Sequence, residues 1–211
     1  MASTTFCALY LGLYVSGHLP PPPLSNNICL DEKLAFLRDN PPADPNFVVI
    51  GSSVAWRNFD SSVVEREVPG ARPLNAGFCG MQVHEAAFIA NWVIDRYPQV
   101  QDVLLIVSPG DYQTCRGSGR VFDPVDANKF VFERKWKWGF YLRYFDPVSL
   151  VRNIERKAHH EAEARALGFA IEFTDFGDGP ADTMMDRGLF YGAMPRPDPA
   201  CFEAVRSIAT K

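Results

Sequence analysis

A chain of 211 residues with 47% hydrophobic residues is long enough for one α/β domain with a sizeable core. The net charge is −4 and the isoelectric point is near 5.6, and no dense run of Lys and Arg occurs. This balance argues against nucleic acid as the main partner, because no cationic face is predicted for the phosphates. An uncharged small molecule or a glycan is the expected ligand.

The N-terminal segment from Thr5 to Val15 is apolar and carries no charge. It is shorter than the roughly 20 residues that a bilayer-spanning helix needs, and no positive charge precedes it as in a secretory signal. Two interpretations stay open: a packed terminal segment, or the end of a membrane anchor that tethers an extracytoplasmic domain. Pro20 to Pro23 predict a stiff spacer, so residues 1–24 are expected to form a separate segment before the domain at 25–211.

The central stretch of the domain is Asn46 to Ala55, where a run of β-branched residues breaks at Gly51. Such a run predicts a buried parallel strand, and the glycine allows a sharp turn at its end. Ala71 to Asn75 predicts a short second strand. Asp102 to Ser108 predicts a third, again as an unbroken apolar run.

Helical patterns separate these strands, and further helices follow them. The predicted helices cover about residues 31–38, 60–67, 82–97, 147–167 and 199–211. Helices between successive strands imply right-handed crossovers and a parallel sheet. The expected fold is therefore a three-layer α/β/α sandwich of flavodoxin-like type with a mostly parallel sheet.

Residues 112–195 interrupt the alternation with a dense group of aromatic side chains, which predicts a packed subdomain or lid inserted in the domain. After it, Asp198 is a predicted N-cap of the last helix. A crossover helix normally leads to another strand, and none follows Lys211. We therefore expect either the N-terminal part of a longer protein or a last helix that caps the sheet.

Three loops at the predicted strand ends carry the candidate chemistry: Gly51-Ser52-Ser53, Asn75 to Gly80, and Ser108-Pro-Gly-Asp111. Ligands of open α/β sheets bind beyond the carboxyl ends of the strands. A serine there can act as a nucleophile if a base accepts its proton, and backbone N–H groups can stabilise the oxyanion. The alternative for the two serines is that they cap the following helix.

In order and spacing these loops resemble the SGNH/GDSL hydrolase superfamily, particularly its membrane-associated branch, in which Gly-Ser-Ser replaces Gly-Asp-Ser. The resemblance covers residues 46–114. It implies a serine esterase or acyl (acetyl) transferase that acts on a carbohydrate or lipid-like ester and needs no metal or organic cofactor. It also implies that Ser53 is the nucleophile and that the N–H of Gly80 binds the oxyanion.

Two departures from this family pattern bear on catalysis. The third block of the family carries Asn next to Asp, whereas here Gly110 precedes Asp111, so a side-chain donor is missing. Asn75 and Gln113 are the candidates to replace that donor. Asp111 is expected to orient the loop or to cap a turn.

The second departure concerns the base, which in the family comes from a C-terminal Asp-x-x-His. No histidine follows His160, and Asp198-Pro-Ala-Cys201 has the outline of that block with Cys in place of His. We interpret this outline as a coincidence, because Asp198 is better explained as a helix cap. A truncated chain would lack the true Asp and His. Without them, the sequence equally describes an inactive domain that binds a glycan or a partner protein.

Other residues near the crevice have less specific roles. Ser52 and His84 are expected to contact a ligand, and His84 is not expected to serve as the base, because the start of its helix does not place the ring near Ser53. The five cysteines include no Cys-x-x-Cys pair, so neither a zinc site nor a redox motif is predicted, and Cys79 is expected to be a small buried residue. A nucleotide site is not expected, because no glycine-rich phosphate loop is present.

Overall fold

The structure is a computed structural model of the chain, and it describes residues 2–167, 171–179 and 196–210. Its centre is a sheet of three parallel strands, β1 (Phe47–Gly51), β2 (Pro73–Asn75) and β3 (Asp102–Ile106), in the order β2-β1-β3. Val48 of β1 lies opposite Leu74 of β2 and Val103 of β3, which fixes the register. The parallel α/β class predicted from the sequence is confirmed.

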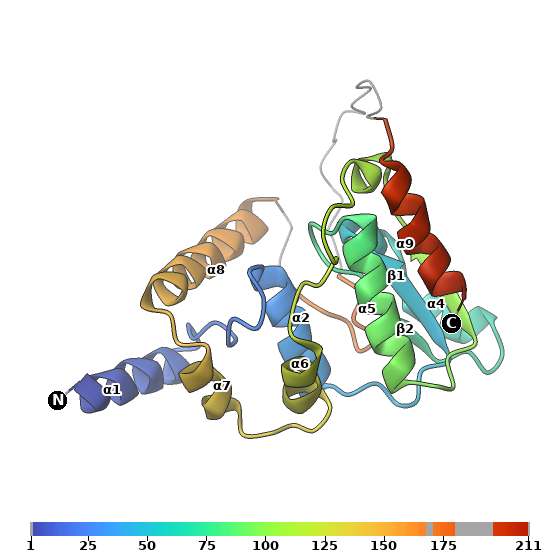
Figure 1. The fold of residues 1–211 in the computed structure, drawn as a ribbon. Coiled ribbons are helices and arrows are strands. Elements are labelled where there is room, and N and C mark those ends of the chain that lie inside the picture. Colours follow the sequence, from blue (N-terminus) through green and yellow to red (C-terminus); the bar gives the residue numbers. More distant parts are fainter. Residues whose placement is uncertain (1, 168–170, 180–195, 211) are drawn as a thin grey trace.

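Helices connect the strands on both faces of this sheet. The short helices α3 (Ser53–Asn58) and α4 (Ser61–Glu67) lead from β1 to β2, and α5 (Val83–Arg96) leads from β2 to β3. Because β2 and β3 flank β1, right-handed crossovers place these two connections on opposite faces. The last helix, α9 (Pro199–Ala209), lies beside α5 in front of the sheet (Figure 1).

The remaining elements lie before β1 or after β3. They are α1 (Ala2–Val15), α2 (Ile28–Asp39), the 3-10 turn η1 (Pro109–Tyr112), α6 (Pro124–Val131), α7 (Lys137–Arg143) and α8 (Pro147–Leu167). The expected aromatic insertion therefore consists mainly of helices. Its Phe130 and Phe140 join Leu30 and Leu34 of α2 in the main hydrophobic core, which supports the prediction of packed rather than exposed aromatic residues.

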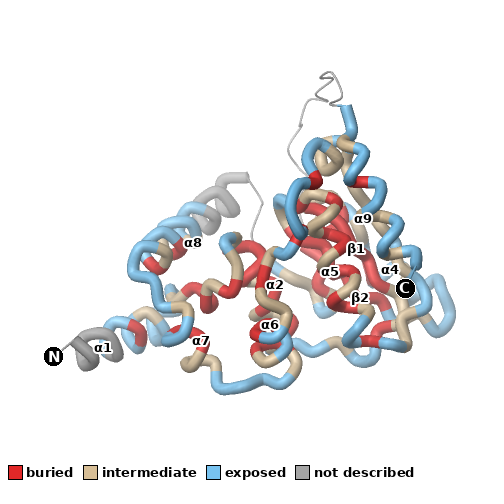
Figure 2. Tube along the Cα trace, in the orientation of Figure 1, coloured by how far each residue is buried: buried red, intermediate tan, exposed pale blue. Residues whose placement is uncertain are grey.

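The core is centred on β1, as its β-branched sequence predicts. Val48, Val49 and Ile50 have no exposed surface, and Figure 2 shows this strand as a buried stretch between partly exposed helices. Ile89 and Ala90 of α5 are equally buried in the same region. Burial on both faces is what a central parallel strand requires.

The two outer edges of the sheet differ. Residues 173–179, called the covering segment below, run beside β2, where the Asn75 N–H donates to the carbonyl of Phe176 at 2.9 Å. No strand among the described residues pairs with the outer edge of β3, and Leu104 is 38% exposed there. The apolar run at 102–106 predicted a strand but not this exposure.

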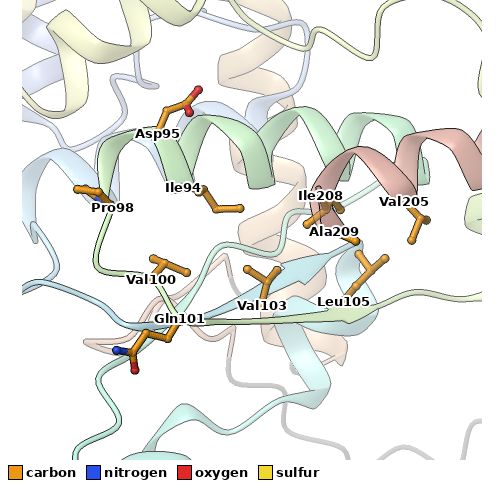
Figure 3. A pocket seen from close by; sticks show the side chains of 10 residues that line it. All are labelled: Ile94, Asp95, Pro98, Val100, Gln101, Val103, Leu105, Val205, Ile208 and Ala209. Carbon is orange, nitrogen blue, oxygen red and sulfur yellow. The ribbon is translucent and has the colours of Figure 1, made fainter. Parts of the chain in front are cut away.

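A groove lies along the open edge of β3. It has a volume of about 790 Å³, and Val103 and Leu105 of β3 point from below toward Val205 and Ile208 of α9 (Figure 3). A sheet edge with free backbone groups is a place where another strand can pair. The sequence predicted, as one of two possibilities, a last helix that caps the sheet. Helix α9 does so only in part, because it packs on α5 and leaves the edge of β3 accessible.

The N-terminal region differs from the extended spacer that the sequence predicted. Pro20 and Pro21 are buried, and the hydroxyl of Tyr141 in α7 donates to the Pro20 carbonyl at 2.8 Å. Tyr10 of α1 packs edge-on against the same Tyr141, with ring centroids 5.5 Å apart. The polyproline stretch therefore lies against the domain. Among the described residues, no helix has the length and apolar character needed to cross a bilayer.

Candidate functional site

The carboxyl end of β1 and the loop after β2 lie side by side. Beyond β2, the Ala76 N–H donates to the Val49 carbonyl at 2.8 Å, and the Phe78 N–H donates to the Gly51 carbonyl at 3.0 Å. These bonds extend the strand pairing and hold the loop against β1. The two segments that the sequence analysis assigned to the nucleophile and the oxyanion therefore meet at the same edge of the sheet.

Glycines make this close approach feasible. Gly51 has φ +150°, and a Cβ added there would lie 1.9 Å from the Ile106 carbonyl oxygen at the end of β3. A Cβ on Gly77 would lie 2.8 Å from the Trp56 nitrogen in α3. Side chains at these two positions would push apart β1, β3 and the start of α3, so both glycines are required by packing.

The adjacent serines have different environments. Ser52 is buried and is the N-cap of α3, with its side chain accepting from the Val54 N–H at 3.5 Å. Ser53 is the first residue of α3 and is half-buried. The capping alternative therefore holds for Ser52, which leaves Ser53 as the serine that is accessible at the end of β1.

Gly80 lies at the exposed end of the loop with φ +71°, and the nearest atom to an added Cβ is Nδ2 of Asn27, 3.7 Å away. Asn27 is the N-cap of α2, and the same amide donates to the Cys79 carbonyl at 3.1 Å. Cys79 is joined to Cys29 by a disulfide, which the sequence analysis did not foresee. The start of α2 therefore fixes the turn that carries Gly80.

Asn75 makes contacts that differ from the oxyanion contact expected from the sequence. It is completely buried, and its Nδ2 donates to the Ala55 carbonyl at 3.0 Å and to Asp178 Oδ1 at 2.8 Å. Its Oδ1 accepts from the Gly77 N–H at 2.9 Å. Asn75 thus links the end of β2, the first turn of α3 and the covering segment, and so positions the site.

The third predicted loop closes on itself at the end of β3. Asp111 Oδ2 accepts from the Ser108 N–H at 2.8 Å, and the Asp111 N–H donates to the Ser108 carbonyl at 3.0 Å. Asp111 therefore caps η1, which is one of the two roles predicted for it. A Cβ added to Gly110 would meet its nearest atom, Ser108 Oγ, at 3.5 Å, so a side chain fits at this position.

His84, in the first turn of α5, lies under the loop that carries Gly119, whose added Cβ would come within 2.5 Å of the His84 carbonyl oxygen. The His84 Nδ1 is buried and has no hydrogen-bond partner among the residues that the structure describes. Asp198 is the N-cap of α9, as predicted, and the N–H groups of Ala200 and Cys115 hold its pKa below the usual range. Cys201 forms a disulfide with Cys115 and is completely buried.

A buried polar cluster behind the site was not predicted. Asp178 accepts from the Ser61 N–H at 3.0 Å and from Ser61 Oγ at 2.8 Å, in addition to its bond with Asn75. Lys33 of α2 donates to the Gly177 carbonyl, and burial lowers the pKa of Lys33 to about 7, opposed by the charge of Asp178. The cluster anchors the covering segment.

One sequence signal could have revealed Lys33. It lies three residues after Leu30 and four before Leu37, so helical spacing places it in the middle of the apolar face of α2. A lysine in that position either extends to solvent or is buried with a partner. The partners in the segment at 173–179 cannot be read from local spacing.

Together, the fold and site define a small α/β protein with a serine and a fixed glycine turn at the carboxyl edge of a parallel sheet. No protein-family model, no curated protein and no solved structure matches this chain. The assignment of a function therefore depends on the chemistry of the site itself.

Proposed function

We propose that this protein is an SGNH-type serine esterase or acyl transferase that acts on a carbohydrate or lipid-like ester. The observation that carries the proposal is the pairing of the loop at 76–78 with the end of β1, next to Ser53. In the proposed α/β/α sandwich, this edge of the sheet forms the substrate crevice. A half-buried serine at the start of a helix and an exposed glycine turn are two of the components that acyl transfer needs.

In the proposed reaction Ser53 Oγ attacks the ester carbonyl, and the N–H groups of Ser53 and Gly80 bind the oxyanion. The C–O bond to the alcohol then breaks, and the alcohol leaves with the proton that a base took from the serine. Water or an acceptor hydroxyl next attacks the acyl carbon and gives its proton to the base. The bond from that carbon to Ser53 Oγ then breaks, the acid or new ester leaves, and the base returns the proton to the serine. The reaction needs a base that accepts the serine proton, and no metal or organic cofactor takes part.

The remaining predicted residues receive supporting roles in this proposal. Ser52 caps α3, Asn75 positions α3 against the loop, and Asp111 closes the turn after β3. Their hydrogen bonds hold the three strand ends in a fixed arrangement. Such preorganisation is the main source of oxyanion stabilisation, and the loss of one donor typically costs about 2.7–4 kcal/mol of barrier.

The direct test is covalent labelling of the full-length protein with an organophosphonate probe, followed by mass spectrometry, together with hydrolysis of p-nitrophenyl acetate. We expect the label on Ser53, and we expect Ser53→Ala to abolish both labelling and turnover. Ser52→Ala is the matched control, because it removes a neighbouring hydroxyl and about 1 kcal/mol of capping energy while leaving the nucleophile. If the folded wild-type protein stays unlabelled at Ser53, the proposed enzymatic activity is refuted.

A second test measures the turnover rate of variants at Gly110, where the structure leaves space for a side chain. Gly110→Asn restores a side-chain amide next to Asp111, where the added Cβ has its nearest neighbour at 3.5 Å. If the crevice catalyses acyl transfer, the extra donor should raise the turnover rate by about tenfold or more. Gly110→Ala, which adds the Cβ without a donor, should leave the rate unchanged.

The alternative function is a catalytically inactive domain that binds a glycan or a partner protein in the same crevice. The engagement of the Asn75 amide with Ala55 and Asp178 favours it, because that amide is not directed to an oxyanion. Glycan binding by the wild-type protein together with an unlabelled Ser53 would select this alternative.

A further inference from the structure

Exposed apolar side chains are concentrated in one part of the molecule, away from the sheet. Of the fourteen large hydrophobic side chains that are exposed among the described residues, nine lie in α1 or in the stretch 136–151, which runs from the N-cap of α7 into the start of α8. These nine are Leu9, Leu11, Tyr14, Val15, Trp136, Leu142, Phe145, Val148 and Val151. We call this set the α1–α7 face. A group of exposed apolar side chains in one region is typical of an interaction site.

Contacts between α1 and α7 show that these residues form one region. The rings of Tyr14 and Trp138 lie 5.6 Å apart, and those of Tyr10 and Phe145 lie 6.2 Å apart. Leu150 of α8 belongs to the same small hydrophobic cluster. In Figures 1 and 2, α1 extends from this cluster at the side of the molecule opposite α9, with exposed residues along it.

The charge of this region is opposite to that of the whole chain. Residues 134–152 contain five basic residues, Arg134, Lys135, Lys137, Arg143 and Arg152, and only one acidic residue, Asp146, whereas the chain carries a net charge of −4. Neighbours compensate some of these charges, since Arg143 pairs with Asp126 and Lys135 pairs with Glu133. The Arg143 side chain is nevertheless 61% exposed.

Aromatic and basic groups alternate in this segment. Trp136 is the most exposed aromatic residue of the face, at 68%, and Lys137 follows it with its Nζ 4.6 Å from the centre of the Tyr14 ring. Trp and Tyr next to Lys and Arg are the residues that occupy the interface between headgroups and acyl chains. An uncharged helix such as α1 supplies the apolar surface that enters the outer part of a bilayer.

We propose that the α1–α7 face binds the surface of an anionic phospholipid bilayer. The exposed side chains of α1 and α7 enter the interface, while the cations at 134–152 contact the lipid phosphates. The apolar surface supplies the hydrophobic term and the local positive charge supplies electrostatic attraction. In Figure 1, α1 and α7 lie away from β1, the strand that leads to Ser53, so the test of this surface is independent of any enzymatic activity.

The test is co-sedimentation of the full-length protein with two kinds of vesicle, one of phosphatidylcholine alone and one of phosphatidylcholine and phosphatidylglycerol in equal parts. We expect binding to the anionic vesicles that weakens as salt is added. Arg152→Glu should lower the partition coefficient about fivefold or more. Emission from Trp136 should shift to shorter wavelength on binding, and Trp136→Phe should reduce that shift.

Leu142→Glu tests the apolar contribution, and Val63→Glu is its matched control, because Val63 is an exposed apolar residue on α4, outside the face. We expect Leu142→Glu to lower binding about tenfold and Val63→Glu to leave it unchanged, with unaltered thermal melting in both. Equal losses in the two variants, equal binding to neutral and anionic vesicles, or no binding would overturn the proposal. So would a vesicle-free dimer that Leu142→Glu dissociates, since a second copy would then cover the face.

Discussion

The two edges of the sheet are completed in opposite ways. At β2, the covering segment places Asp178 and Gly177 against Ser61, Asn75 and Lys33, and all three residues of the strand are buried. At β3, the strand faces a groove, and Leu104 is partly exposed. The comparison shows that neither edge can be inferred from the composition of its strand, because the more apolar strand is the exposed one.

The closed edge also depends on buried polar groups, which makes it sensitive to substitution. A buried carboxylate with several donors contributes little net stability, but its removal leaves those donors without partners. Among the described residues, the open edge contains no such buried carboxylate, and each residue of β3 is at least partly exposed. Substitutions at the closed edge should therefore have larger effects than those at the open edge.

Asp178→Ala should have the largest effect. It leaves the Ser61 N–H, the Ser61 hydroxyl and the Asn75 amide without their acceptor, and it removes the carboxylate that favours a charged Lys33. We expect a loss of about 3–5 kcal/mol in the free energy of unfolding, measured by urea denaturation. Asp102→Ala on the open edge is the control and should change it by less than about 0.5 kcal/mol. Similar losses would show that the edges do not differ.

The pH dependence of the free energy of unfolding should reveal the lowered pKa of Lys33. Its pKa is about 7 in the folded protein and near the ordinary value of 10.5 when unfolded, so between these values the unfolded chain binds more protons. The free energy of unfolding should therefore rise with pH from about 7 upward, by up to about 1.4 kcal/mol per unit. Lys33→Met should remove this rise, whatever it does to absolute stability. A slope that persists in the variant would assign it to another group.

Gly179→Ala tests the packing of the covering segment. A Cβ at this position would lie 2.3 Å from the ring of Trp56, which is itself buried, so the segment or the ring must move. Overpacking of this kind costs about 1–3 kcal/mol, measurable as a lower urea midpoint. Gly110→Ala should be nearly neutral, because its Cβ meets nothing closer than 3.5 Å.

Leu104→Thr should have the smallest effect. Leu104 lies on the open edge and is 38% exposed, so we expect a change of about 0.5 kcal/mol or less. The replacement Val48→Thr in β1 also introduces a threonine, but it buries the hydroxyl in the centre of the sheet. It should lower the free energy of unfolding by about 1–3 kcal/mol. Comparable melting temperatures for the two variants would contradict the placement of β3 at an exposed edge.

Local sequence patterns predicted the elements whose determinants are close together in the chain. The β-branched run at 47–51, the helical spacing at 83–96 and Asp198 as the cap of α9 all reflect interactions over a few residues. The sharp turn at Gly51 was also predicted from its position after the strand. These features placed the three candidate loops at one edge of the sheet.

The features that the sequence did not reveal depend on residues far apart in the chain. Asn75 was assigned to the oxyanion because its bond to Asp178, 103 residues away, leaves no local pattern. The two disulfides join cysteines 50 and 86 residues apart. The exposure of β3 follows from its place at the edge of the sheet, and apolar composition alone describes a central strand equally well.

The covering segment also has a consequence for synthesis on the ribosome. Ser61 and its acceptor Asp178 are 117 residues apart, and Lys33 and the Gly177 carbonyl are 144 residues apart. At ordinary elongation rates, on the order of ten seconds separate the emergence of these partners from the exit tunnel. During that interval β2 lacks its covering segment and Lys33 lacks its carbonyl partner, so the closed edge can form only after residue 179 has emerged.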